Sequence, residues 1–286
     1  MPATTSTRLV TSAAETRAAV LAAQRGGDTI GFVPTMGALH AGHLSLVEAA
    51  QACCDRSIVS IFVNPTQFGS DEDLHRYPRE LDKDVQLLEK LGCWLVFVPS
   101  TEEMYASEGE ALLEVGEVAR PWEGAARPGH FRGVATIVKK LFEVVPADRA
   151  FFGQKDYQQT LVVQELVRNC DIPIKIEVCP TVRESDGLAM SSRNAYLSDE
   201  QRKQARSLWQ ALQLVEQWYS DGKTDVADMT QRLRQHFATF AGVEVEYIAF
   251  MAAGTVAPLT TVTGPTVAAL AVRVGQTRLI DNHLIG

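Results

Sequence analysis

Residues 31–43 read Gly31-Phe-Val-Pro-Thr-Met-Gly-Ala-Leu-His40-Ala-Gly-His43, an apolar run followed by small residues and two histidines. The apolar and β-branched residues before Pro34 predict a buried strand. The glycines after it predict a turn that lets the backbone approach a ligand, and a helix is expected to begin near His43. The segment is typical of the strand-to-helix turns at which open α/β sheets bind ligands.

The two histidines of this turn suit an anion. The start of a helix presents free backbone N–H groups and a positive dipole, and His40 and His43 lie on the same side of that turn, where both can donate to phosphate oxygens. A metal site is the alternative, completed in space by His75 or His130, although no further Cys or His follows at zinc-finger spacing. Neither G-x-x-x-x-G-K-[ST] nor G-x-G-x-x-G is present, so the two commonest phosphate loops are absent.

Strand and helix patterns alternate on both sides of this turn. Ser12 and Glu15 form a capping-box pattern, and Pro78 suits the first turn of a helix. Because parallel strands need crossover connections, the alternation predicts an α/β fold with a doubly wound parallel sheet. Helices are predicted over residues 12–25, 42–52, 78–91, 133–145 and 157–169, and strands over residues 29–33, 57–63, 94–98, 149–152 and 174–179.

The pattern changes after about residue 186. A helix capped by Ser198 is predicted to run to about Trp218, and a second helix covers residues 225–239. Two helices followed by a small sheet predict a separate, smaller α+β domain. We therefore expect domains at residues 1–185 and 186–286. The three strands of the second domain are predicted at residues 244–252, 265–274 and 277–281.

The composition limits the classes of function. The chain has 286 residues and a formal net charge of −8, which argues against a nucleic-acid binder with a diffuse basic surface. Its five cysteines lack C-x-x-C spacing, so reduced structural thiols are expected. Glu15, Arg17 and Arg25 interrupt the candidate signal-peptide core, and no run approaches the ~20 apolar residues of a membrane span. We expect a soluble, cytoplasmic protein with no membrane partner.

Amide side chains follow the next predicted strand, in Ser-Ile-Phe-Val-Asn-Pro-Thr-Gln-Phe at residues 60–68. The strand is apolar, and Asn64 and Gln67 appear where it should open into the same crevice. Amide donors and acceptors suit the hydroxyl and carboxylate groups of a small polar substrate. A plain Asn-Pro turn is the alternative.

A third strand-to-helix turn reads Phe-Phe-Gly-Gln-Lys-Asp at residues 151–156. Asp156 in the first helical turn is ordinary capping. Lys155 opposes the helix dipole unless an anion is bound, which favours an anion site here. Gln159, one turn later, is expected on the same face as Lys155.

Two further segments carry charge and hydroxyl groups. Residues 183–194, Arg-Glu-Ser-Asp-Gly-Leu-Ala-Met-Ser-Ser-Arg-Asn, suit either a mobile phosphate clamp or a solvated linker between the domains. Residues 127–133, Arg-Pro-Gly-His-Phe-Arg-Gly, gather two arginines and His130 before a predicted helix. An anion site and a surface loop are both compatible with that second pattern.

Taken together, these segments resemble the pantothenate synthetase (pantoate–β-alanine ligase) family, whose members are adenylate-forming nucleotidyltransferases with a H-x-G-H motif. The resemblance runs from about Leu9 to residues 279–282 in the family's order. It implies a Rossmann-like sheet with a smaller α+β C-terminal domain that closes as a lid, ATP with Mg²⁺ as cofactor, and a homodimer. The matching strings are V-P-T-M-G-A-L-H-A-G-H, S-I-F-V-N-P-T-Q-F, R-P-G-H-F-R-G-V, F-G-Q-K-D and D-G-L-A-M-S-S-R-N.

The resemblance also implies roles for individual residues. His43, His40 and Lys155 would be catalytic, and no protein residue is assigned to the metal. One departure is Gln154, where the family has Glu. The ATP site would comprise Met36, Gly37, Ala38, Leu39, His40, Ala41, Gly42, His43, Gly153, Gln154, Lys155, Asp156, Val182, Met190, Ser191, Ser192 and Arg193. The substrate site would comprise Gln67, Gln159, Asn64, Met36 and His130.

The implied reaction has two steps. The carboxylate of pantoate attacks the α-phosphorus of ATP and expels pyrophosphate, and the amine of β-alanine then attacks the acyl-adenylate, giving pantothenate and AMP. Two alternatives remain from the sequence: a related nucleotidyltransferase that acts on a phosphate acceptor, and a non-catalytic nucleotide-binding module. The module would leave the amide side chains of residues 60–68 unexplained.

Overall fold

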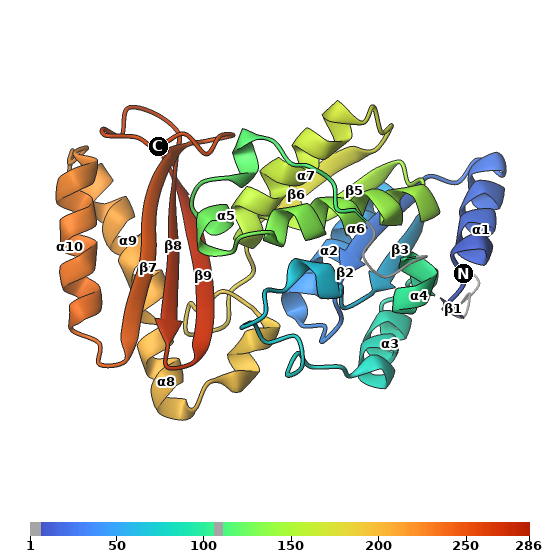
Figure 1. Cartoon of the computed structure of the whole chain (residues 1–286), viewed down its shortest axis with the longest axis horizontal. Helices are drawn as coiled ribbons and strands as arrows, with labels where there is room; N and C mark the ends of the chain where they lie inside the picture. Colours follow the sequence, from blue (N-terminus) through green and yellow to red (C-terminus); the bar gives the residue numbers. More distant parts are fainter. Residues whose placement is uncertain (1–6, 106–110) are drawn as a thin grey trace.

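The computed structural model describes residues 7–105 and 111–286 and contains two sheets that lie along the long axis of the molecule (Figure 1). The larger sheet has six parallel strands in the order β1-β4-β3-β2-β5-β6. Its order confirms a doubly wound sheet, because the chain moves outward from β2 in one direction and then returns to build the other half. The strands are β1 (Arg8–Val10), β2 (Ile30–Thr35), β3 (Arg56–Ile61), β4 (Leu95–Phe97), β5 (Arg149–Gly153) and β6 (Lys175–Cys179).

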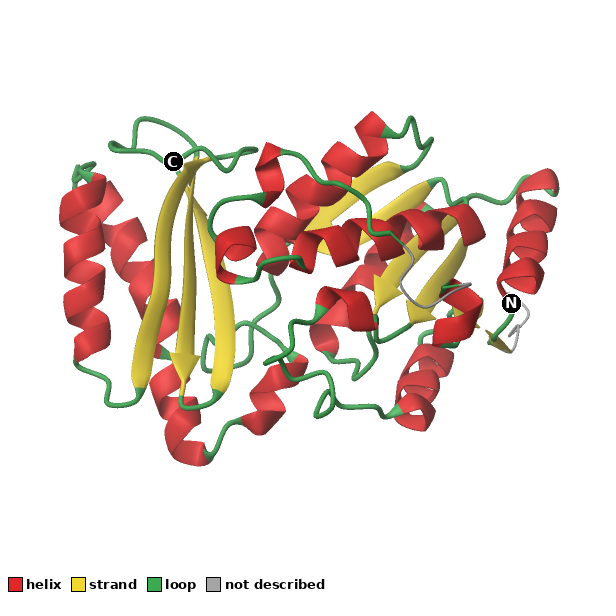
Figure 2. Cartoon of the chain, viewed as in Figure 1, coloured by secondary structure: helices red, strands yellow, loops and turns green. Residues whose placement is uncertain are grey.

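Helices cover both faces of this sheet (Figure 2). Neighbouring strand residues alternate between the two cores: Phe32 packs with helices α1, α6 and α7, whereas Val33 packs with α2 and α3. This period of two, with apolar residues on both faces, explains why the strands read as continuous hydrophobic runs. The helices are α1 (Ala13–Arg25), α2 (Ala41–Cys53), α3 (Leu81–Lys90), α4 (Thr101–Met104), α5 (Glu123–Ala126), α6 (His130–Val144) and α7 (Tyr157–Asn169).

The C-terminal part folds around the second sheet, which is antiparallel with the order β7-β8-β9. Helices on one face of that sheet form a separate core with it. On its other face, Trp122 and Tyr157 from the larger part pack against Met251 and neighbouring sheet residues. The smaller α+β unit of the sequence analysis is therefore present. Its elements are α8 (Asp199–Ala205), α9 (Ser207–Ser220), α10 (Val226–Ala238), β7 (Val243–Ala252), β8 (Thr266–Val274) and β9 (Thr277–Ile285).

Three expected helix boundaries are wrong. The helix expected to begin at Gly133 begins three residues earlier, at His130, directly after the left-handed backbone of Gly129. The third helix begins at Leu81 with Glu80 as its N-cap, three residues after Pro78, because Glu80 adopts a non-helical backbone conformation. The long helix expected from Ser198 to about Trp218 is two helices separated at Arg206. Arg206 has a φ of −60° and a ψ of −20°, and Ala205 and Leu208 on either side of it both belong to the C-terminal core.

The sequence patterns also missed several short elements. These are β1, α4, α5 and four 3₁₀ segments, and each has five residues or fewer, which is too short for a hydrophobic pattern to repeat. Among the helices of residues 7–105 and 111–286, none has the length and apolar character needed to cross a membrane. The 3₁₀ segments are η1 (Pro65–Gln67), η2 (Glu117–Ala119), η3 (Gln154–Asp156) and η4 (Ser192–Tyr196).

Candidate active site

A cavity of about 220 Å³ opens at the carboxyl ends of β2, β3, β5 and β6. Strands β2 and β5 are neighbours in space, but two strands and their crossovers separate them in sequence. The cavity therefore lies at the point where the order of the strands reverses. Open α/β sheets bind ligands at this point because the loops on either side diverge. The segments after all four strands, and residues 190–193 from beyond β6, contribute side chains to its wall.

The two histidines after β2 cap each other at the start of α2. His40 is the N-cap, and its Nδ1 accepts the N–H of Gly42 at 3.2 Å, while Nδ1 of His43 accepts the N–H of His40 at 3.4 Å. Their rings stack with centroids 4.1 Å apart. Because each Nδ1 is an acceptor, each neutral ring carries its proton on Nε2, which is left as a donor.

Both imidazoles are held in the neutral state. Burial, followed by the charge of Lys155, lowers the pKa of His40 to about 4. Burial, with the neighbouring His40, lowers the pKa of His43 to about 3. A neutral donor at a helix N-terminus can stabilise an anion by hydrogen bonding without being deprotonated at pH 7.

Asp84 of α3 fixes the turn that precedes the histidines. Gly37 has a φ of 79°, and Ala38 has a φ of 50°, which is uncommon for a residue with a side chain. The buried carboxylate of Asp84 accepts the N–H groups of Ala38 and Leu39, both at 2.8 Å. These two hydrogen bonds stabilise the strained turn and therefore fix the position of His40 as the N-cap of α2.

Residues Asn64 and Gln67, after β3, form a connected amide pair. Asn64 Nδ2 donates to Gln67 Oε1 and to the carbonyl of Gly133, each at 3.2 Å. Gln67 Nε2 lies 3.0 Å from the sulfur of Met36, a weak acceptor that a better ligand can replace. Gly133 allows α6 to approach η1 so closely that an added Cβ would lie 2.3 Å from the Thr66 carbonyl oxygen.

The turn after β5 brings a cation to the same cavity. Lys155 and Asp156 end the short segment η3, and Lys155 Nζ lies 3.6 Å from Asp156 Oδ1. Asn282 of β9 donates from Nδ2 to the carbonyls of Gln154 and Lys155, both at 2.9 Å. The C-terminal sheet thus holds the backbone from which Lys155 projects.

The serine-rich segment also reaches the cavity, with its arginine already paired. Arg193 donates from Nε and Nη2 to the two carboxylate oxygens of Asp73 at 2.8 and 2.7 Å. Ser191 Oγ accepts the N–H of Arg193, and Ser192 Oγ lies 3.1 Å from the hydroxyl of Tyr77. An anion that binds Arg193 has to share this guanidinium with Asp73.

Most residues of the expected sites line this one cavity, and a few do not. Gly37, Ala38, Leu39 and Ala41 contribute to the turn that carries the histidines, and Gln154 faces Asn282 with its side chain at 3.5 Å. The residues that line it are Met36, His40, Gly42, His43, Asn64, Gln67, His130, Gly153, Lys155, Asp156, Gln159, Val182, Met190, Ser191, Ser192 and Arg193.

Sequence reasoning did not select several residues that shape this wall. Tyr77, Arg127 and Thr181 line the cavity, and Asp84 supports it from behind. Arg127 belongs to the basic segment at residues 127–133, and its position directly before a predicted helix could have indicated a place in the site. Asp84 lies among other charged residues of α3, and its burial depends on a contact 45 residues away in sequence.

The metal alternative for the histidines finds no support in the described residues. Within residues 7–105 and 111–286, no group of three or more His, Cys, Asp or Glu side chains is arranged to hold a metal ion. His130 is buried beside Arg127, whereas His75 lies exposed in the loop after η1. Neither His75 nor His130 therefore completes a metal site with His40 and His43 in the described residues.

A doubly wound sheet with a histidine-capped helix N-terminus at the reversal of its strand order defines an α/β protein that is built to bind an anionic ligand at that point. The chain belongs to the pantoate-beta-alanine ligase family, whose sequence model matches residues 8–284.

Curated relatives and solved structures agree with this assignment. A pantothenate synthetase of Herpetosiphon aurantiacus is 50% identical over 264 residues, covering 92% of this chain and 96% of the relative. One from Moorella thermoacetica is 48% identical and covers 97% and 98%. The crystal structure of pantothenate synthetase from Thermus thermophilus superposes with a TM-score of 0.91 at 44% identity, covering 96% and 98%.

A further solved structure carries ligands. It is the pantoate-beta-alanine ligase from Francisella tularensis, described as complexed with beta-gamma ATP and beta-alanine. The TM-score is 0.82 at 33% identity, and the match covers 98% of each chain. Together these likenesses extend over nearly the whole chain, so the fold of both parts is that of the family.

Proposed function

We propose that this chain condenses pantoate with β-alanine to pantothenate, using ATP and passing through a pantoyl-adenylate. The family match over residues 8–284 carries the proposal, and the Francisella relative with its nucleotide and β-alanine supports the choice of ligands. A carboxylate is a poor electrophile, so activation by adenylation precedes attack by the amine. Both steps transfer an acyl or nucleotidyl group directly between ligands, so no covalent intermediate with the protein is required.

His40 and His43 are assigned to the phosphates. Their Nε2–H groups are the free donors of two neutral rings at the N-terminus of α2, where backbone N–H groups also favour an anion. Negative charge grows on the leaving pyrophosphate, and fixed donors stabilise it without reorganisation. Lys155 adds a positive charge in the same cavity, and residues Ser191–Arg193 close it from the other side.

The amide groups are assigned to pantoate. Gln67 and Gln159 line the cavity from η1 and α7, and Asn64 holds the side chain of Gln67 in place. Replacing the weak Met36 sulfur contact of Gln67 by a hydroxyl or carboxylate oxygen of the substrate would strengthen that hydrogen bond. Met36, His130 and the other assigned residues complete the substrate and ATP sites as the resemblance implies.

We assign Mg²⁺ to the nucleotide rather than to a protein cage. Asp156 is the acidic residue among the described residues that line the cavity, so it is the side chain available to the ion or its water molecules. Mg²⁺ keeps several waters and binds substrate phosphates readily, and it would neutralise phosphate charge there.

The remaining assignments concern the whole protein. We propose that residues 1–185 bind ATP and pantoate, that residues 186–286 form a lid that keeps water from the mixed anhydride, and that the enzyme is a cytoplasmic homodimer. Contacts from β9 to Lys155 and Arg183 support a role for the C-terminal part in the site. Excluding water protects a reactive intermediate from hydrolysis.

Pyrophosphate exchange tests the reaction. Labelled pyrophosphate should enter ATP when pantoate and Mg²⁺ are present and β-alanine is omitted, because adenylation is then the one reversible step. Exchange that requires pantoate supports the acyl-adenylate. Absence of exchange with folded protein that binds ATP would contradict it, and retention of the nucleotide in a phosphate-containing product would favour the alternative nucleotidyltransferase.

A further inference from the structure

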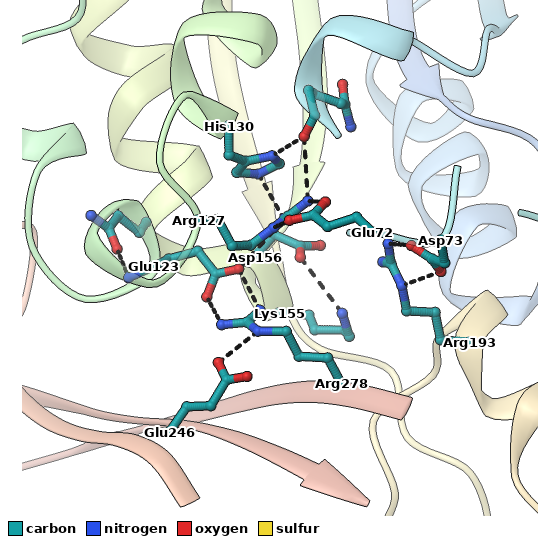
Figure 3. A network of polar contacts seen from close by, with 12 residues as sticks. Glu72, Asp73, Glu123, Arg127, His130, Lys155, Asp156, Arg193, Glu246 and Arg278 are labelled. Atoms are coloured by element: carbon teal, nitrogen blue, oxygen red, sulfur yellow. Dashed lines mark hydrogen bonds and ion pairs between the residues drawn. The ribbon is translucent and has the colours of Figure 1, made fainter. Parts of the chain in front are cut away.

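A row of alternating charges crosses from the C-terminal sheet to the loop beside the cavity (Figure 3). Arg278 of β9 pairs with Glu246 of β7 and with Glu123, the first residue of α5. Arg127, which follows α5, pairs with Glu72 and lies near Glu123. The row therefore joins one part of the chain to the other through the short helix between Glu123 and Arg127.

Glu123 is the buried centre of this row, with 6% of its surface exposed. Arg278 donates to both of its oxygens, from Nη1 at 2.7 Å and from Nη2 at 2.8 Å, and the hydroxyl of Tyr247 adds a bond at 3.1 Å. Burial alone would raise the pKa of Glu123, but the hydrogen bonds and charge of Arg278 outweigh it and lower the pKa to about 2. Glu123 is thus a buried anion neutralised mainly by Arg278.

The segment before Glu123 is also held by the C-terminal sheet. Trp122 has a φ of 52°, an outlier for a residue with a large side chain. Its indole nitrogen donates to the carbonyl of Val256 at 3.0 Å, and its ring lies against that of Tyr247. A strained backbone persists where its surroundings fix it, so the position of Glu123 depends on the C-terminal sheet.

Arg127 transmits this position to Gln67 by two routes. Its Nη2 lies 3.4 Å from the carbonyl oxygen of Gln67. Its Nη1 donates to Nε2 of His130 at 3.1 Å, because a guanidinium has no acceptor. The neutral His130 then carries its proton on Nδ1 and donates to the same Gln67 carbonyl at 2.9 Å.

One nitrogen of Arg127 is shared between Glu123 and His130. Nη1 lies 3.5 Å from Glu123 Oε1, at the limit of a hydrogen bond, and 3.1 Å from His130. The contact with Glu123 is long because Arg278 already occupies both carboxylate oxygens. Without Arg278, the buried carboxylate would have Arg127 as its nearest cation and would draw Nη1 away from His130.

We propose that Arg278 is a positioning residue for the substrate pocket. By neutralising Glu123, it leaves Arg127 for His130, Glu72 and the Gln67 carbonyl, and so fixes the backbone of Gln67, whose side-chain amide is assigned to pantoate. This inference rests on the proposed function, since it assigns a consequence for pantoate to a residue of the C-terminal sheet. Arg278 acts through Glu123 and Arg127 and does not itself touch the substrate.

A double-mutant cycle tests the competition between the two arginines. In pantoate-dependent pyrophosphate exchange, Arg278→Gln should raise the KM for pantoate about tenfold, the size of a weakened charge-assisted hydrogen bond, and leave the KM for ATP within about twofold. Glu123→Gln removes the charge that draws Arg127 away. The double variant Glu123→Gln/Arg278→Gln should therefore return the KM for pantoate to within about threefold of the unmodified enzyme.

The rescue separates positioning from simple structural support. If Arg278 only held the two parts together, the double variant would be at least as impaired as Arg278→Gln. That result, an unchanged pantoate KM in Arg278→Gln, or equal changes for pantoate and ATP would each overturn the proposal. Failure of the unmodified enzyme to exchange pyrophosphate with pantoate would instead count against the proposed function.

Arg273 supplies a matched control on the same sheet. It pairs with Glu246 at 2.9 Å, and its side chain is 48% exposed. Arg273→Gln removes a charge from the outer end of the row without changing the partners of Glu123. The pantoate KM of this variant should stay within about twofold of the unmodified enzyme, and a tenfold rise would point to a general effect of surface charge.

Discussion

At the scale of single residues, the two histidines show how one contact can set both structure and chemistry. Each imidazole satisfies a backbone N–H at the start of α2 through Nδ1, and this leaves Nε2–H as the ring's donor, which we assign to the phosphates. The spacing of His40 and His43 predicted that they share one side of the turn. It did not predict that they would cap each other, because a capping box usually has a hydroxyl and a carboxylate or amide.

Replacing His43 by alanine tests the role of its Nε2 donor. His43→Ala should lower the rate of pantoate-dependent pyrophosphate exchange about 100-fold, because it removes a donor to charge that develops in the transition state. His75→Ala is the matched control, since His75 is exposed in the loop after η1. Full exchange activity in a folded His43→Ala protein would remove His43 from the mechanism.

At the scale of elements, the close approach of η1 to α6 positions the assigned pantoate amide. Gly133 lies where the α6 backbone meets the carbonyl of Thr66, and Asn64 bonds the carbonyl of Gly133 itself. The sequence placed Gly133 at the start of a helix and Gln67 after a strand. Their contact joins residues more than 60 positions apart in the chain, so no local pattern contains it.

Gly133→Ala should disturb this junction. The added methyl group would lie 2.3 Å from a backbone carbonyl oxygen, so α6 or η1 has to shift. A shift of Gln67 should raise the KM for pantoate about tenfold or more in the exchange assay, with a smaller effect on ATP.

Gly264→Ala is the comparison for that variant. An added Cβ at Gly264 meets no atom within 4 Å, and its backbone does not have a positive φ. Both kinetic constants of Gly264→Ala should match those of the unmodified enzyme. Equal pantoate constants for the two glycine variants would show that the η1 junction does not control substrate binding.

At the scale of the whole molecule, buried neutral histidines make stability depend on pH. Burial, then the charge of Arg127, lowers the pKa of His130 to about 4, whereas an unfolded histidine titrates near 6.5. Between these values the unfolded chain binds more protons than the folded chain. The contribution of His130 to the free energy of unfolding is therefore complete above about pH 7, and it is lost as the pH drops toward 4.

Urea titrations at several pH values measure this contribution. Between pH 8 and pH 5, His130 should account for about 2 kcal/mol of the loss in the free energy of unfolding. His130→Gln should lose less stability than the unmodified protein over that interval by about this amount. Identical slopes for the unmodified protein and His130→Gln would contradict the assignment of a buried neutral His130.

The amino-acid sequence alone determined the order of the longer strands and helices, the α/β class with its smaller α+β unit, and the segments that meet at the cavity. These features follow from hydrophobic periodicity and from motifs read within short windows of the chain. Tertiary structure decided the support of the histidine turn by Asp84 and the pairing of Arg193 with Asp73. It also decided which cation neutralises Glu123. These pairings depend on burial and on contacts between distant parts of the chain. A charge that is removed from water needs a partner of opposite charge, and only the folded structure determines which residue lies close enough.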